Sequence, residues 1–117
     1  MTSNANDPAW ESWRPLNEKH DSHERGVQRI SLTANTSGSY NTAVGMSALR
    51  YSTTANDNTA VGYFALSSNT TGSQNTGFGR GVMATNTTGS NNTAVGNRAF
   101  ENNTTGQENV AVGSQAL

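Results

Sequence analysis

The chain has 117 residues, enough for one small domain, but only 32% of them are hydrophobic, and Asn, Thr, Ser and Gly together supply 57. Such a composition is typical of a disordered chain or of a repeat protein rather than of a conventional globular domain. The net charge of −1 gives no cationic surface for nucleic acid or an anionic membrane. The absence of cysteine excludes disulfides and thiolate metal sites.

The first 15 residues are predicted to form an extended attachment peptide. Both tryptophans, Trp10 and Trp13, lie between Pro8 and Pro15, and proline disfavours helices and central strands. Exposed aromatic side chains often dominate protein interfaces, so we expect this segment to bind another protein. The alternative is that the tryptophans fold back to cap the next element. The chain start has no signal-peptide pattern, which favours a protein made and kept in a cytosol and gives no expectation of membrane insertion.

Residues 16–34 are predicted to form a short helix followed by a linker. Residues 1–34 carry 9 of the 15 charges, which sets this part of the chain apart. Apolar and histidine positions recur at alternating spacings of four and three, the pattern of a parallel coiled coil, here expected to be trimeric. The residues of this seam are Leu16, His20, His23, Val27 and Ile30. The alternative is one surface helix with a weak apolar stripe.

His20 and His23 are weak candidates for a metal site. Three copies of the coiled coil would place their rings around the threefold axis, where a divalent metal or an anion could bind. Uncharged core histidines that pair with each other or with water are the simpler interpretation. We therefore predict no metal and no cofactor.

From residue 35 onward the sequence repeats every 17 residues. Each copy contains an NTTG block, or a variant of it, followed by a pentapeptide close to NTAVG. The pentapeptides begin at Asn41, Asn58, Asn75, Asn92 and Asn109. Two turn signals in each copy leave segments too short for helices. The sequence thus predicts a mainly β fold, a parallel β-solenoid (β-roll) over residues 35–117, with two short strands in each 17-residue coil.

Large apolar side chains at two positions of the repeat are predicted to form the solenoid core. These residues are Val44, Leu49, Val61, Leu66, Phe78, Met83, Val95, Phe100, Val112 and Leu117. Because this apolar supply is small for one chain, we expect three chains to share a core as a homotrimer. Alanines would then allow close approach across the seam between chains; they are Ala43, Ala60, Ala94 and Ala111.

The repeat pattern NTTGxxNTAVGxxAL over residues 35–117 resembles the head repeats of trimeric autotransporter adhesins, whose V-A-I-G segments build a left-handed parallel β-roll. It is still more similar to the shaft repeats of bacteriophage tail fibres. The resemblance implies a trimeric fibre whose N-terminal end attaches to the virion. This chain departs from the pattern at Ala55, which replaces a glycine, and at Gly77, Gly79 and Gly81 in one copy. These departures predict an irregular coil or a bend.

No constellation of residues indicates an enzyme. The glycine-rich run from Gly77 to Val82 lacks the strand, loop and helix of a phosphate-binding site and is a copy of the repeat. The chain has no cysteine nucleophile and no G-x-S-x-G elbow, and both histidines lie outside the repeat.

Together these patterns predict a structural virion fibre, assembled in the host cytoplasm and placed in a phage tail, neck or capsid appendage. The N-terminal segment would bind another virion protein, and the shaft would project a host-receptor-binding tip. That tip is expected in a longer chain, because the sequence stops at Leu117 without a polar cap. Two alternatives stay open: the head of a bacterial trimeric adhesin, and an ice-binding solenoid. The second would use a threonine ladder formed by Thr36, Thr53, Thr70, Thr87 and Thr104.

Overall fold

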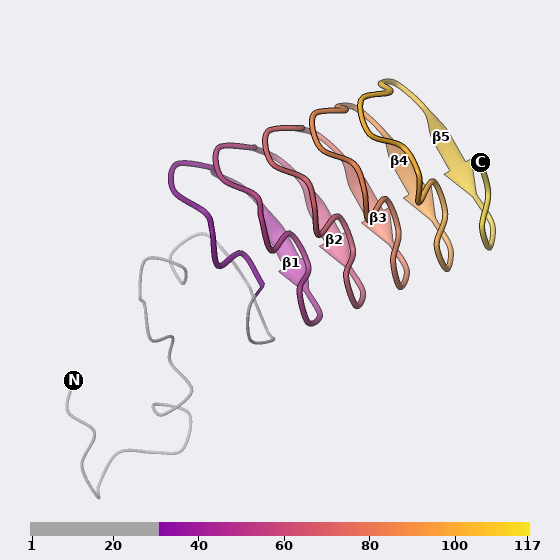
Figure 1. Cartoon of the computed structure of the whole chain (residues 1–117), viewed down its shortest axis with the longest axis horizontal. Helices are drawn as coiled ribbons and strands as arrows, with labels where there is room; N and C mark the ends of the chain where they lie inside the picture. The colour runs from indigo at the N-terminus through magenta and orange to yellow at the C-terminus, as the bar shows by residue number, and fades with distance from the viewer. Residues whose placement is uncertain (1–30) are drawn as a thin grey trace, which may run out of the picture.

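A computed structural model describes residues 31–117. Within that range the chain winds into a parallel β-solenoid, in which each coil contributes one three-residue strand to a single sheet (Figure 1). The strands are β1 (Thr42–Val44), β2 (Thr59–Val61), β3 (Thr76–Phe78), β4 (Thr93–Val95) and β5 (Val110–Val112), and they lie in chain order across the sheet. We number the coils 1 to 5, over residues 35–51, 52–68, 69–85, 86–102 and 103–117.

Two predicted elements lie outside the described residues. One is the attachment peptide over residues 1–15, with its tryptophans and prolines. The other is the coiled-coil seam from Leu16 to Ile30, with both histidines.

Equivalent residues of successive coils pair with each other. Thr42 lies opposite Thr59, and Ala60 lies opposite Gly77. The same register continues from β3 through β5. The predicted parallel solenoid with a 17-residue coil is therefore confirmed. The bend expected at Ala55 and at the glycines of coil 3 is not found, because the strand register is unbroken across both coils.

Each described coil has one strand, where two were predicted. The remainder of the coil enters the left-handed backbone region several times. In coil 2, Asp57, Gly62, Phe64 and Leu66 have φ values of 62°, 137°, 63° and 51°. Such residues interrupt an extended backbone, so the segments between them form turns. Within residues 31–117 no helix forms, and thus none that could cross a membrane.

The solenoid core contains alanines together with larger apolar side chains from coils 1 to 4. The alanine at the centre of a strand points inward, and Ala43, Ala60 and Ala94 are fully buried. A second alanine, five positions further along the chain, also points inward in these coils. Four of the ten predicted core residues are buried: Leu49, Leu66, Met83 and Phe100.

The valine half of the predicted core does not line the interior of the single chain. Phe78, Val95 and Val112 are 43%, 41% and 67% exposed, and Val44 and Val61 are only half-buried. Side chains of a strand alternate between its two faces, and the central alanine occupies the inward one. The residues on either side of it must then face outward. Leu117 is also exposed, unlike its buried equivalents in the other coils.

This orientation also corrects the expected role of the alanines. Ala43, Ala60, Ala94 and Ala111 line the interior of their own chain, not a seam between chains. The stack begins before residue 35, within the predicted linker. Leu32 is fully buried, and its N–H donates to the Ala48 carbonyl at 3.2 Å. The Ala34 N–H donates to the Arg50 carbonyl at 3.3 Å, so residues 31–34 belong to the solenoid.

Candidate interaction face of the solenoid

A ladder of buried asparagines fixes the position of every strand. The Asn75 N–H donates to Asn58 Oδ1 at 2.9 Å, and Asn75 Nδ2 donates to the Gly89 carbonyl at 2.8 Å. Asn75 Oδ1 in turn accepts from the Asn92 N–H at 3.0 Å. Asn75 therefore joins three coils, through its backbone N–H to coil 2 and through its side chain to two backbone groups of coil 4. The ladder holds equivalent strands side by side, so that their outward residues form one regular face.

A second asparagine ladder runs along the NTTG turns. Asn86 Nδ2 donates to Asn69 Oδ1 at 2.8 Å, and Asn103 Nδ2 donates to Asn86 Oδ1 at 2.6 Å. In coil 2 this position is Ser52, whose hydroxyl is buried without a hydrogen-bond partner. The second ladder is thus interrupted at one coil.

The threonines considered for ice binding at the sequence level donate to backbone instead. The hydroxyls of Thr36, Thr70 and Thr87 donate to the carbonyls of Thr53, Thr87 and Thr104 at 3.1, 3.2 and 3.1 Å. Thr53 makes the same bond to Thr70 at 3.3 Å. Because these donors are occupied, this ladder stabilises the coil stack.

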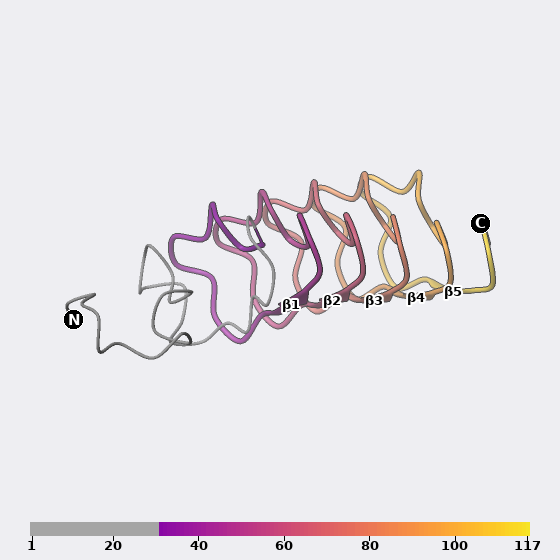
Figure 2. The same ribbon diagram turned by 90° about the horizontal axis from the view of Figure 1, so that it is seen from below.

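The outward face of the sheet carries a different ladder. Figure 2 shows the five strands side by side along one side of the coil stack. Threonine precedes the inward residue of β1 to β4, and an apolar side chain follows it in every strand. The face thus presents a row of threonine hydroxyls and a parallel row of apolar side chains. We call it the strand face.

An aromatic corner lies at the end of the strand face, beyond the glycine that closes each pentapeptide. The rings of Tyr63 and Phe64 stack with their centroids 4.4 Å apart and an interplanar angle of 9°. The Arg80 guanidinium lies over the Tyr63 ring, 5.8 Å from its centroid. Met46, one coil earlier than Tyr63, is exposed, as are both rings. Large apolar side chains and a cation therefore lie together on the surface of coils 1 to 3.

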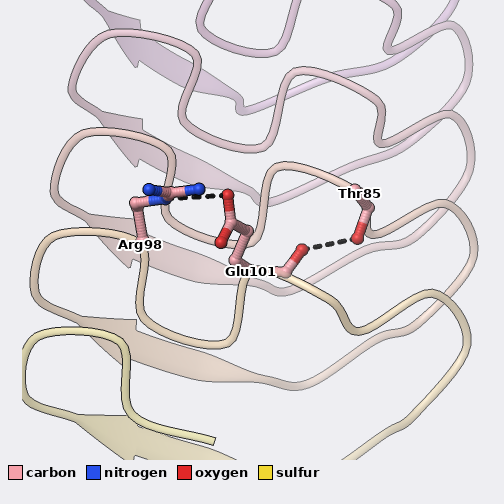
Figure 3. Close-up of polar contacts among 3 residues, drawn as sticks. All are labelled: Thr85, Arg98 and Glu101. Atoms are coloured by element: carbon pink, nitrogen blue, oxygen red, sulfur yellow. Dashed lines mark hydrogen bonds and ion pairs between the residues drawn. The ribbon is translucent and has the colours of Figure 1, made fainter.

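The ionisable groups of the described residues form one ion pair. Arg98 Nε lies 3.0 Å from Glu101 Oε2, and the Thr85 hydroxyl donates to the Glu101 carbonyl one coil further on (Figure 3). Both charged side chains are partly exposed, so the pair contributes little to stability. Within residues 31–117 no group of three or more His, Asp or Glu side chains could hold a metal ion. The Thr85 hydrogen bond joins coils 3 and 4, whereas the ion pair lies within coil 4.

The aromatic corner was missed at the sequence level. Tyr63, Phe64 and Arg80 occupy the two positions after the pentapeptide glycine, where the copies differ most: Met-Ser, Tyr-Phe, Arg-Gly, Asn-Arg and Ser-Gln. That variability on an otherwise constant repeat was the available signal for an exposed site. The chain matches no known protein family, no curated protein and no solved structure.

Proposed function

We propose that this chain is the repeat shaft of a homotrimeric virion fibre, with its strand faces packed together around a common axis. The observation that carries the proposal is the continuous row of apolar side chains on the outward face of all five strands. Phe78, Val95 and Val112 are each more than two-fifths exposed in a single chain. Contiguous exposed apolar surface of this kind marks interaction sites.

The periodicity of the strand face favours an identical chain as the partner. Neighbouring strands lie about 4.8 Å apart, so this face presents the same side chains again at every coil. A protein partner can match such a face along its whole length only if it repeats with the same rise. A second copy of the solenoid meets that condition at every coil. Three copies would give each apolar row two neighbours and remove it from water.

The remaining parts of the proposal follow from the sequence. The segment with Trp10 and Trp13 would bind another virion protein, and a region distal to the repeats would bind the host receptor. The resemblance of the repeat to phage fibre shafts supports a virion location over a bacterial adhesin head, which shares the fold. In either case the repeats serve as a stiff spacer, and no reaction is assigned to them.

The mass of the full chain in solution tests the proposal. Native mass spectrometry is expected to give three times the chain mass, and a stable monomer would overturn the trimer. The variant Val61→Asp/Val95→Asp places charges on the strand face and should yield folded monomers. Thr71→Asp/Thr88→Asp, on exposed turn residues, is the matched control and should remain trimeric. Circular dichroism verifies that each variant retains its strands.

One observation favours ice binding as a second candidate. Thr42, Thr59, Thr76 and Thr93 lie opposite one another in register on the strand face, where they present hydroxyl and methyl groups at a regular spacing. This row differs from the threonine ladder expected from sequence. A monomer that produces thermal hysteresis, lost in Thr59→Asp/Thr76→Asp, would establish this function. A trimer without thermal hysteresis would exclude it.

A further inference from the structure

We infer that Arg80 of one chain forms an ion pair with Asp57 of the neighbouring chain, at the aromatic corner. The inference rests on the proposed homotrimer and deepens it, because it assigns the contact that joins the edges of adjacent strand faces. It gives a function to the cluster of Tyr63, Phe64 and Arg80, which the shared apolar row does not explain.

Asp57 and the aromatic corner lie at opposite ends of the strand face. Asp57 immediately precedes the pentapeptide that contains β2, and its N–H donates to the Ser39 carbonyl at 3.0 Å. Tyr63 immediately follows the same pentapeptide. The pentapeptide alone spans about 16 Å at about 3.3 Å per residue. These two exposed edges are therefore well separated within one chain.

Cyclic symmetry brings the two edges together between chains. In a closed ring of identical subunits with heterologous contacts, one patch of each subunit meets a different patch of the next. If the strand faces surround a common axis, the edge where one strand ends lies beside the edge where the neighbour's strand begins. The aromatic corner then meets the Asp57 edge.

The two charges lie at matching levels along the rod. Arg80 belongs to coil 3, but its guanidinium extends over the ring of Tyr63, which belongs to coil 2 together with Asp57. In a parallel trimer, equivalent coils lie at the same height. The guanidinium of one chain is then level with the carboxylate of the next. Tyr63 and Phe64 would cover the pair from solvent.

Charge complementarity supports the same pairing. Among residues 31–117 the ion pair present is Arg98 with Glu101, and neither Arg80 nor Asp57 contacts an opposite charge there. Burial of either charge alone at an interface is costly, and attraction between the two opposite charges offsets part of that cost when both are buried together. Arg80 and Asp57 thus place opposite charges at the two edges of the strand face that meet between neighbouring chains of a trimer.

Charge reversal in the full chain tests the pairing. Arg80→Asp and Asp57→Arg are each expected to raise the chain concentration needed for half-assembly at least about tenfold, and the double variant should restore assembly. Arg98→Asp is the matched control, since it removes a pair within one chain and should leave assembly unchanged. Analytical ultracentrifugation measures assembly, and circular dichroism verifies folding of each variant.

Cysteine cross-linking provides a second measurement, because the native chain has no cysteine. The variant Asp57→Cys/Tyr63→Cys should give covalent trimers under oxidation, since the two sites within one chain lie beyond the roughly 7 Å that a disulfide spans between Cα atoms. A wild-type monomer would overturn the homotrimer and this inference together. A wild-type trimer that tolerates both charge reversals and does not cross-link would overturn the ion pair alone.

Discussion

Gly77 and Val82 share one space in the core of coil 3. A Cβ atom placed on Gly77 would lie 2.9 Å from Val82 Cγ1, closer than real side chains approach. In the other coils both positions are alanine, as in Ala60 and Ala65. In coil 3 the smaller side chain at position 77 is therefore matched by a larger side chain at position 82, and the two together fill about the same space as two alanines. This compensation explains why the glycine produces no bend.

The first prediction concerns this compensation. Gly77→Ala should lower the free energy of unfolding by about 1–3 kcal/mol through overpacking against Val82. Val82→Ala should lower it by about 2 kcal/mol through a cavity. The double variant recreates the alanine pair of the other coils and should unfold close to wild type. Urea unfolding of the three variants measures the coupling, and additive losses would show that the two positions are independent.

The second prediction concerns Ser52 and Ala55, which replace the usual asparagine and glycine. A Cβ atom on Gly72 would clash with the Gly89 carbonyl of the next coil and would lie 2.6 Å from Asn69 Oδ1 in its own coil, so an asparagine at the first position favours a glycine at the fourth. Ser52→Asn alone should therefore destabilise the protein. Ser52→Asn/Ala55→Gly should continue the interrupted ladder and raise the thermal unfolding midpoint, with a gain of about 1 kcal/mol. A double variant no more stable than Ser52→Asn would contradict this account.

The third prediction tests the strand-positioning ladder. Asn75→Ala removes the acceptor of the buried Asn92 N–H and one of the two donors to the Gly89 carbonyl, which keeps its bond from Asn86 Nδ2 at 3.0 Å. A buried group left without a partner costs about 1–3 kcal/mol, so a loss of about 1–3 kcal/mol is expected in chemical unfolding. Thr88→Ala, on the exposed turn of coil 4, should change stability by less than about 0.5 kcal/mol. Equal effects of the two variants would be inconsistent with a structural ladder.

The sequence predicted the period, the parallel stacking and the leucine row, but not the direction of the valines. Side chains alternate between the two faces of a strand, so Val44 and Ala43 must point to opposite faces. The alternation does not indicate which of the two faces is buried. Hydrophobicity favoured the valine. The better signal was Asn41, which lies on the same face as Ala43. Stacked asparagines bond the backbone groups of neighbouring coils in the interior of the solenoid, so the asparagine side chain must point inward. Alanine then also points inward, and valine points outward.

The aromatic corner could not be predicted for a different physical reason. Tyr63, Phe64 and Arg80 meet because coils 2 and 3 stack after a left-handed turn, with a φ of 63° at Phe64. A phenylalanine in that backbone region is uncommon, and no local preference of the sequence indicates it. The contact between Arg80 and Tyr63 arises because coil 3 stacks on coil 2. It can therefore be identified only from the backbone path of both coils.

The last prediction separates the two faces of one strand. Ala60→Val adds two methyl groups to the filled interior of coil 2 and should lower the free energy of unfolding by about 1–3 kcal/mol. Thr59→Val, one residue earlier on the outward face, should be neutral or slightly stabilising, because β-branched residues favour strands and coil 5 carries Val110 at that position. Urea unfolding at several chain concentrations measures both. If Ala60 instead lay between chains, Ala60→Val would alter the dependence of unfolding on concentration and leave the stability of the isolated chain unchanged.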